Sequence, residues 1–274
     1  MKIRTNQINE EISDVIVDWG DENYSKISNG DYVSSDLNVE DMECDYTVEH
    51  NYKETGKYII KVYGKQCYNI QGLSNADSDR FKYNLICRAF SHDLPISKSL
   101  TNLAGFLKNS NHLLNVVIPS YLDLSHVTNY YTLFSECHNL LSIKGLKNKF
   151  INVKAANTIF YNCKSLKYLE YTLPAFTIEK NGIANSFYNI ALSCDINDLM
   201  PDKGFIGSEY DVTRLFTNCK YLTGIVPTDK LWNNRNINWI LPTNQKQLPF
   251  FGCSDNIRLQ VPISWGGLAS DDII

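Results

Sequence analysis

From residue 100 to residue 257 the chain repeats one short pattern of apolar and polar positions. Three clear copies begin at Leu133, Ile159 and Leu215, and each reads apolar-Phe-x-x-Cys-x-x-Leu. A bulky apolar residue recurs at positions 107, 134, 160, 187, 216 and 250, so the intervals are 27, 26, 27, 29 and 34 residues. A period near 27 predicts an array of structural repeats, because one such unit cannot bury its apolar face until a neighbour stacks on it.

The residue types within the pattern predict where each side chain lies. The large Phe and Leu residues are expected to face the core, where a reduced cysteine behaves as a small apolar residue. Ser110 takes the position of the cysteine in an earlier copy, whereas Ile190 departs from the pattern. A run of four residues with apolar ends follows each cysteine and predicts one short parallel strand per repeat. The predicted core comprises Phe134, Cys137, Leu140, Phe160, Cys163, Leu166, Phe216, Cys219 and Leu222.

Prolines follow three of these runs, at Pro119, Pro174 and Pro227. With them, the pattern resembles the leucine-rich repeats of bacterial surface antigens of the BspA-like type, over about 150 residues. The resemblance implies a leucine-rich-repeat solenoid with short parallel strands and short helical turns at residues 106–274. Residues 260–267 are similar to the ending of several such proteins in gut bacteria and their phages. The tryptophan in that segment is expected to cap the open end of the array.

Residues 1–64 follow a different pattern, in which apolar and polar positions alternate. Residues 15–21 alternate and then enter a Gly-Asp turn, and further alternating stretches occupy residues 46–52 and 58–64. Strands at this spacing, with no helical stretch between them, predict a small β-sandwich. Residues 65–105 are expected to connect the two parts and to cover the first repeat. The predicted fold class is therefore mainly β.

Three short motifs in the first part resemble the polycystic-kidney-disease (PKD) type of immunoglobulin-like domain. They are Asp18-Trp19-Gly20-Asp21, His50-Asn51-Tyr52 and Gly56-Lys57-Tyr58, while Glu22 replaces the glycine that usually follows the second aspartate. The resemblance implies a PKD-like β-sandwich at residues 1–64. Asp18 and Asp21 could help to bind a cation or act as acid and base, but a calcium site needs six or more oxygen ligands. We therefore expect these aspartates to cap backbone N–H groups in the turn.

Charge separates the same two parts of the chain. The 274 residues carry 26 basic and 30 acidic side chains, and residues 1–64 hold 14 of the acidic and 6 of the basic ones. The first part is therefore −8 and the remainder, with 16 acidic and 20 basic side chains, is +4. This balance disfavours nucleic acid as a partner. No apolar run is long enough to span a bilayer, and no secretory leader is visible at the start. We expect no membrane insertion and folding in a cytoplasm.

No pattern of catalytic or metal-binding residues emerges from the sequence. None of the eight cysteines forms a CxxC pair, and the phosphate-loop, nucleophile-elbow and zinc-protease motifs do not occur. His112 and His138 lie one repeat apart, but a metal site would need further ligands. The prediction is therefore no enzyme, no catalytic residue, no cofactor and no metal. A disulfide between stacked repeats is not excluded by geometry.

Exposed aromatic residues are the best candidates for contacts with a partner, since they offer a large area at a small cost in conformational entropy. These candidates are Tyr121, Tyr130, Tyr131, Tyr168, Tyr171, Trp232 and Trp239. Each could instead support the fold, and the segment from Trp232 to Trp239 could be a recognition loop or could tuck under its own repeat.

Family resemblance places such proteins on bacterial surfaces and on phage particles. The lack of a visible leader favours a non-catalytic virion protein, made in the host cytoplasm and attached to the capsid or tail. Its expected partners are other virion proteins, or a protein or glycan of the host surface, and self-association stays open. One alternative is an exported adhesin on the bacterial cell surface whose leader has been removed. Another is a carbohydrate-active enzyme, because the separation of carboxylates is a three-dimensional quantity.

Overall fold

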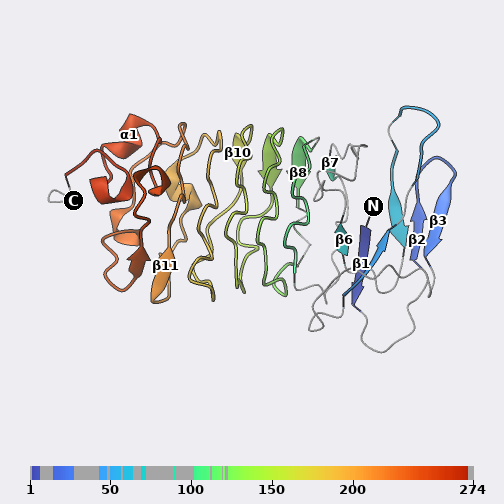
Figure 1. The fold of residues 1–274 in the computed structure, drawn as a ribbon, viewed down its shortest axis with the longest axis horizontal. Coiled ribbons are helices and arrows are strands. Elements are labelled where there is room, and N and C mark those ends of the chain that lie inside the picture. The colour runs from blue at the N-terminus through green and yellow to red at the C-terminus, as the bar shows by residue number, and fades with distance from the viewer. Residues whose placement is uncertain are drawn as a thin grey trace. The chain divides into compact units, whose positions relative to one another are not determined.

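A computed structural model of the chain describes residues 2–6, 15–27, 43–47, 50–56, 58–63, 69–71, 89–90, 102–111, 113–118, 120 and 123–270 (Figure 1). The chain divides into two compact units. The N-terminal unit comprises Met1–Leu73 with Leu94–Leu100, and the C-terminal unit comprises Ser74–Asp93 with Thr101–Ile274. The predicted boundaries near residues 64 and 105 remain predictions, because residues 64–68 and 91–101 lie outside the described residues.

The N-terminal unit contains two small antiparallel sheets. In one, β1 (Lys2–Asn6) pairs with β4 (Glu43–Thr47) and β6 (Asn69–Gln71). In the other, β2 (Val15–Asp18) pairs with β3 (Tyr24–Ile27) and β5 (Lys61–Tyr63). Successive side chains of β2 point to opposite faces of the sheet, so Val17 is fully buried while Ile16 is exposed. The strand predicted at residues 46–52 ends at Thr47 as β4, and residues 50–52 are not in a strand.

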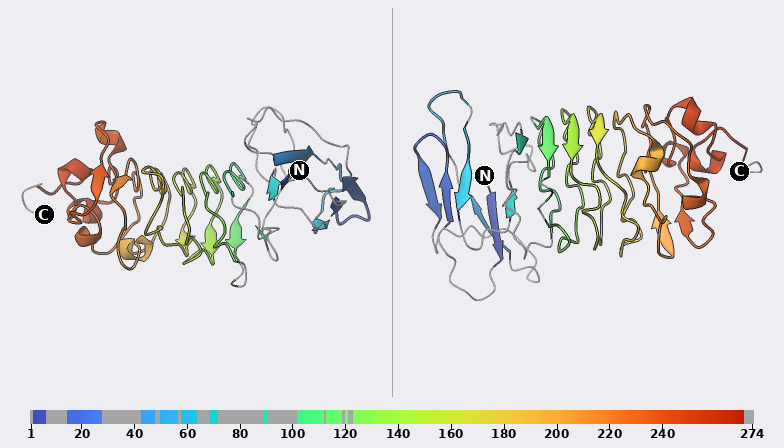
Figure 2. Two further views of the ribbon diagram at one scale, coloured as in Figure 1. Left: turned by 90° about the horizontal axis from the view of Figure 1, so that it is seen from below. Right: turned by 180° about the vertical axis from the view of Figure 1, so that it is seen from behind.

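Short parallel strands occur in the C-terminal unit at two of the three predicted runs, residues 140–143 and 166–169, whereas the run at residues 222–225 forms only an isolated bridge at Thr223. The sheet follows the order β10 (Tyr168–Leu169), β9 (Ser142–Lys144), β8 (Asn115–Val117), β7 (Ala89–Phe90). Its register pairs Ala89 with Asn115, Asn115 with Ser142, and Ser142 with Tyr168. The partners are one repeat apart in sequence, so neighbouring repeats lie side by side (Figure 2). A second parallel pair joins β11 (Glu209–Asp211) to β12 (Asn238–Ile240).

Backbone hydrogen bonds join the repeats along a second line as well. The amides of Gly105, Leu107 and Asn109 donate to the carbonyl oxygens of Tyr131, Leu133 and Ser135, each at 2.9 Å. The same alternation recurs in every later repeat up to Asn218, whose amide donates to the carbonyl oxygen of Phe251. Every second amide of this segment therefore bonds to the following repeat.

Left-handed residues create this alternation. Each repeat has two positive-φ residues four apart, and the pairs are Gly105 and Asn109, Thr132 and Glu136, Thr158 and Asn162, Asn185 and Asn189, and Arg214 and Asn218. All ten of their amides donate to the next repeat. A left-handed residue interrupts right-handed helical geometry, so the segment cannot close into an α-helix. These segments are therefore turns and not helices.

Among the described residues, helical geometry occurs in the later connections instead. The 3-10 helices are η1 (Ile196–Leu199), η2 (Thr228–Lys230), η3 (Gln245–Gln247) and η4 (Ile263–Trp265), and the one described α-helix is α1 (Asp255–Arg258). None of the helices in the described part of the chain has the length and hydrophobicity that a membrane span requires.

The core of the C-terminal unit is a column of phenylalanines. The ring of Phe160 lies 5.7 Å from that of Phe134 and 5.8 Å from that of Phe187, and Phe216 and Phe250 continue the column at 5.2 and 5.3 Å. The nine predicted core residues, at positions 134, 137, 140, 160, 163, 166, 216, 219 and 222, are all buried. The repeat pattern therefore marks the side chains that hold successive repeats together.

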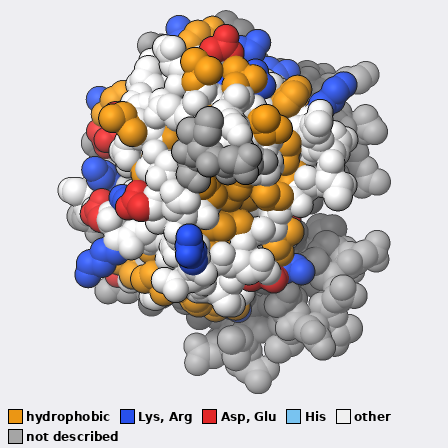
Figure 3. All heavy atoms as spheres, turned by 90° about the vertical axis from the view of Figure 1, so that its left-hand side faces the viewer, with side chains coloured by type: hydrophobic (Ala, Val, Ile, Leu, Met, Phe, Trp, Pro, Cys, Tyr) orange, Lys and Arg blue, Asp and Glu red, His pale blue; other side chains and the backbone are white. Residues whose placement is uncertain are grey.

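The end of the array is closed by residues 255–269. The amide of Phe250 donates to the carbonyl oxygen of Trp265 at 3.0 Å, and the Trp265 side chain is buried, as a capping role predicts. Apolar side chains gather on this end of the unit (Figure 3), and Leu259, Ile263 and Leu268 are exposed large hydrophobic residues of this segment.

Candidate functional site

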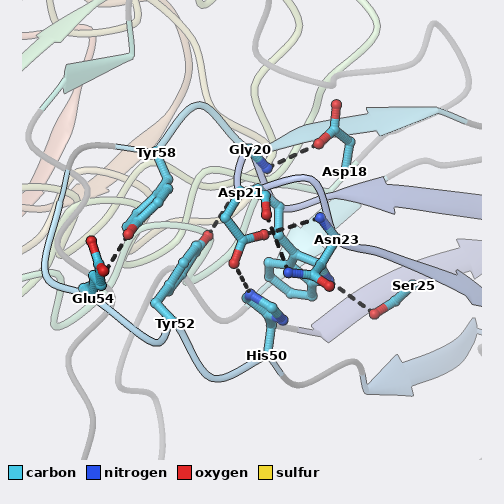
Figure 4. Close-up of polar contacts among 10 residues, drawn as sticks. Asp18, Gly20, Asp21, Asn23, Ser25, His50, Tyr52, Glu54 and Tyr58 are labelled. Carbon is cyan, nitrogen blue, oxygen red and sulfur yellow. Dashed lines mark hydrogen bonds and ion pairs between the residues drawn. The ribbon is translucent and has the colours of Figure 1, made fainter.

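The turn between β2 and β3 contains the two aspartates that the sequence offered as ligands or acid–base groups (Figure 4). Asp18 Oδ1 accepts the Gly20 amide at 2.9 Å, and Asp21 Oδ1 accepts the Asn23 amide at 3.3 Å. Gly20 has a φ of 79°, and a Cβ there would lie 2.6 Å from the carbonyl oxygen of Ile59. The aspartates therefore cap backbone N–H groups in a tight turn, as the sequence favoured.

Asp21 also joins this turn to a distant segment through His50. Asp21 Oδ2 lies 2.7 Å from His50 Nε2, and both side chains are largely buried. The His50 ring stacks on Trp19 with centroids 5.0 Å apart and meets Tyr52 edge-on at 4.7 Å. Tyr52 in turn donates its hydroxyl to the carbonyl oxygen of Trp19 at 2.9 Å. Residues of the segments 18–21 and 50–52 thus form one polar and aromatic cluster.

The contacts of this cluster give it a structural role, because they join the turn to residues 50–52. Desolvation works to raise the pKa of the Asp21 carboxyl, but hydrogen bonds from His50 and Asn23 outweigh it and hold the pKa below its ordinary value. Both carboxylate oxygens of Asp21 are engaged by protein groups. Within the described residues, no three His, Cys, Asp or Glu side chains come together as a metal-binding group.

Substituting Asp21 by Asn is expected to lower the stability of the N-terminal unit at about pH 7 and to have a smaller effect at about pH 3. The folded-state pKa is lowered, so the stabilisation is complete above the unfolded value of 3.8 and is lost as the pH falls through the folded value. The urea midpoint of the wild type and of Asp21→Asn, measured at both pH values, checks this. An equal difference at both would contradict a role for the Asp21 charge.

The repeat cysteines form a second regular feature. Cys137 Sγ donates to the carbonyl oxygen of Leu107 at 2.9 Å, and Cys163 Sγ donates to that of Phe134 at 3.0 Å. Cys219 and Cys253 make the same contact, to the carbonyl oxygens of Phe187 and Phe216. Each thiol therefore reaches back by one repeat to a carbonyl group beside the phenylalanine column. These four cysteines are free and buried.

Burial makes the thiols poor nucleophiles. It raises the pKa of Cys137 to about 12 and that of Cys163 well above its ordinary value, because the thiolate would lose its hydration. Iodoacetamide at about pH 8 is expected to leave Cys137, Cys163 and Cys219 unmodified in the native protein and to modify all three in concentrated urea. Peptide mass spectrometry measures both. Rapid modification of the native protein would show that the thiols are accessible.

Outward-facing side chains of the parallel sheet form a continuous surface, which we call the strand face. It comprises Asn115, Val117, Ser142, Lys144, Tyr168 and Glu170. Tyr168 donates its hydroxyl to Glu170 Oε1 at 2.6 Å, and the Gly145 amide donates to Glu170 Oε2 at 2.8 Å. These two bonds, the Tyr168 bond first, lower the pKa of Glu170. Lys144 Nζ lies 5.5 Å from the centroid of the Tyr168 ring.

The predicted contact tyrosines divide into exposed and buried ones. Tyr131 and Tyr168 are exposed, whereas Tyr121 lies outside the described residues. Tyr130 and Tyr171 are buried, so their prediction as contact residues was wrong. Tyr130 stacks on Phe150 at 3.7 Å and donates its hydroxyl to the carbonyl oxygen of Leu124. Both tyrosines lie between the marked positions of the repeat, where the pattern does not define which way a side chain points.

The two tryptophans of the predicted recognition loop also pack inward. Trp232 and Trp239 meet Trp265 with ring centroids 5.3 and 5.5 Å apart. Their Nε1 atoms are buried without a hydrogen-bond partner. The indoles therefore belong to an aromatic cluster beneath the end of the array, and of the two alternatives for this segment the structure favours packing under its own repeat.

Of the six residues of the strand face, only Tyr168 was a predicted contact residue, and Lys144 and Glu170 were not. In the sequence, both residues stand at the end of an extended run, and this position could have marked them as candidates. Only the register of the sheet shows that the two runs are neighbours. Comparison of the chain with protein-family models, with curated proteins and with solved structures found no match.

Proposed function

We propose that this protein is a non-catalytic structural and binding component of a bacteriophage virion. In this proposal a PKD-like β-sandwich is followed by a BspA-type leucine-rich-repeat solenoid. The observation that carries it is the stack of repeats, which backbone hydrogen bonds connect without a break from Gly105 to Phe251. An array of this kind offers an extended, rigid surface whose exposed side chains can differ from repeat to repeat while its core stays the same.

Two exposed tyrosines support a role in binding. Tyr131 and Tyr168 are 46% and 47% exposed, and Val117 on the same sheet as Tyr168 is 48% exposed. Aromatic side chains on a rigid support are typical of contact surfaces with proteins and glycans. We propose other virion proteins, or a protein or glycan of the host surface, as the partner.

The state of the cysteines favours a virion protein over an exported adhesin. Cys137, Cys163, Cys219 and Cys253 are free thiols inside the core. Free thiols are typical of proteins that fold in a reducing cytoplasm, whereas exported proteins fold where disulfides form and persist. A phage structural protein folds in the host cytoplasm before lysis releases the particle, which agrees with this chemistry.

Mass spectrometry of density-purified phage particles tests the proposal. The protein is expected to co-purify with the major capsid and tail proteins at a constant ratio across the particle peak, and gold-labelled antibodies are expected to mark the particles in electron micrographs. A cytoplasmic host protein serves as the control for carry-over. Recovery of the protein in the cell-envelope fraction of uninfected bacteria, and its absence from particles, would instead establish the adhesin.

A further inference from the structure

Two stretches of the chain carry charges of one sign only. Residues 137–169 contain six lysines and no acidic residue, namely Lys144, Lys147, Lys149, Lys154, Lys164 and Lys167. Residues 27–52 contain seven acidic residues and neither lysine nor arginine, namely Asp31, Asp36, Glu40, Asp41, Glu43, Asp45 and Glu49. The first stretch belongs to the C-terminal unit and the second to the N-terminal unit. One chain therefore carries a basic and an acidic segment of similar length.

Three of the lysines lie on the two adjacent repeats that meet at β9 and β10, and we call Lys144, Lys147 and Lys167 the lysine patch. Lys144 lies over the Tyr168 ring, Lys167 precedes Tyr168, and both Lys144 and Lys147 act electrostatically on Glu170. The parallel register keeps them on adjacent repeats, since Tyr168 pairs with Ser142 and the Lys167 amide donates to the carbonyl oxygen of Leu141. The patch is thus fixed by the backbone of two neighbouring repeats.

The positive charge of the patch is only partly offset locally. All three side chains are exposed, and none forms an ion pair with a carboxylate in the described part of the chain. The Glu170 carboxylate accepts the Tyr168 hydroxyl and the Gly145 amide and interacts electrostatically with Lys144 and Lys147, so it offsets one of the three positive charges. A rigid sheet edge that keeps a positive balance beside an exposed tyrosine is suited to an acidic, extended partner.

We propose that the lysine patch docks the acidic segment 27–52 of a second copy of this chain, so that the protein self-associates. Charge complementarity identifies the occupant, because the same chain supplies both a patch in which three exposed lysines outnumber one carboxylate and a segment of seven acidic residues. The patch and the segment are different surfaces, so the contact is heterologous. Repetition of such a contact closes into a ring or extends as a filament. This inference is independent of the virion proposal.

Salt dependence follows from the charges. At an ionic strength of about 0.01 M the Debye length is about 30 Å, and at about 1 M it falls to about 3 Å. The full chain is therefore expected to sediment as oligomers at low salt and as a monomer at high salt. Analytical ultracentrifugation over a range of protein and salt concentrations measures this. A monomer at every protein concentration in low salt would overturn the proposal.

Charge reversal identifies the surface. The triple variant K144E/K147E/K167E is expected to weaken self-association at low salt at least about tenfold. A matched control, K203E/K220E/K246E, makes the same change of charge at three exposed lysines on other repeats and is expected to retain association. Equal weakening by both variants would show a net-charge effect and would overturn the assignment. Far-UV circular dichroism verifies folding, and K144Q/K147Q/K167Q replaces the first variant if the first does not fold.

A mixture of complementary variants tests the occupant. The variant D36K/E40K/D41K alone is expected to remain monomeric at low salt, like K144E/K147E/K167E alone. An equimolar mixture of the two is expected to form hetero-oligomers. The reversed patch of the first variant attracts the reversed segment of the second, and the unchanged patch of the second attracts the unchanged acidic segment of the first. A mixture that stays monomeric would show that the acidic segment does not occupy the patch, and oligomers of D36K/E40K/D41K alone would show the same.

Discussion

Replacement of Phe160 by alanine is expected to destabilise the C-terminal unit by about 3–5 kcal/mol. The Phe160 side chain is fully buried, and its ring contacts Phe134, Phe187 and Tyr171 at centroid distances of 5.7, 5.8 and 5.1 Å. Removing the ring leaves a cavity between three repeats. The backbone hydrogen bonds that join these repeats hold them in place, so the cavity cannot close fully. Urea unfolding followed by far-UV circular dichroism measures the loss as a lower midpoint.

Phe176→Ala is the matched control for this substitution. Phe176 belongs to the same unit but is 47% exposed, so its truncation is expected to cost less than about 1 kcal/mol. The comparison separates burial in the column from the mere loss of an aromatic ring. Similar effects of the two substitutions would contradict the assignment of Phe160 to the core.

Gly145→Ala is expected to destabilise the same unit by about 3 kcal/mol or more, because two costs add. Gly145 has a φ of 81°, which disfavours any residue with a Cβ. A Cβ there would also overlap the carbonyl oxygen of Ile118 in the preceding repeat. That oxygen belongs to the backbone, so it cannot move without disturbing the hydrogen bonds between the two repeats. One of these bonds runs from the Ile118 amide to the carbonyl oxygen of Lys144. The urea midpoint again reports the effect.

Gly105→Ala separates the two costs. Gly105 has a similar φ of 66°, but a Cβ there would meet only Thr132 Oγ1 at an ordinary 3.7 Å. The substitution is therefore expected to cost about 1–2 kcal/mol, the price of the left-handed conformation alone. If both variants unfolded at the same midpoint, close packing of repeats at Gly145 would not be the cause of its larger expected effect.

The repeat itself was predictable because burial depends on residue type at a fixed spacing. The buried column is marked by Phe134, Phe160 and Phe216, and this does not depend on the course of the chain between them. Small residues are needed at the buried positions of Cys137, Cys163 and Cys219. The short strands followed from the same spacing, since a period near 27 brings each run beside its counterpart in the next repeat. The alternation at β2 likewise sufficed to place Val17 in the interior.

Short helices occur in the C-terminal unit as η1–η4 and α1, but the segments with left-handed residues are not helical, for a local reason. Asn109, Asn162 and Asn218 precede the serine or cysteine position and adopt a left-handed conformation, which asparagine tolerates better than most residues. Glu136, Thr158 and Arg214 share that conformation without any such preference. Cross-repeat hydrogen bonds from their amides stabilise it, and these bonds exist only once the neighbouring repeat is in place.

The sequence alone determined the period, the residues of the buried column and the separation of charge into a basic and an acidic stretch. Each of these depends on residue type and position along the chain, and not on which segments become neighbours. The tertiary structure alone decided that Tyr130 and Tyr171 point inward, that His50 meets Asp21, and that Lys144 lies over the Tyr168 ring. Those outcomes depend on contacts between residues 20 or more positions apart or on the register of the sheet, and a pattern along the chain cannot express either of them.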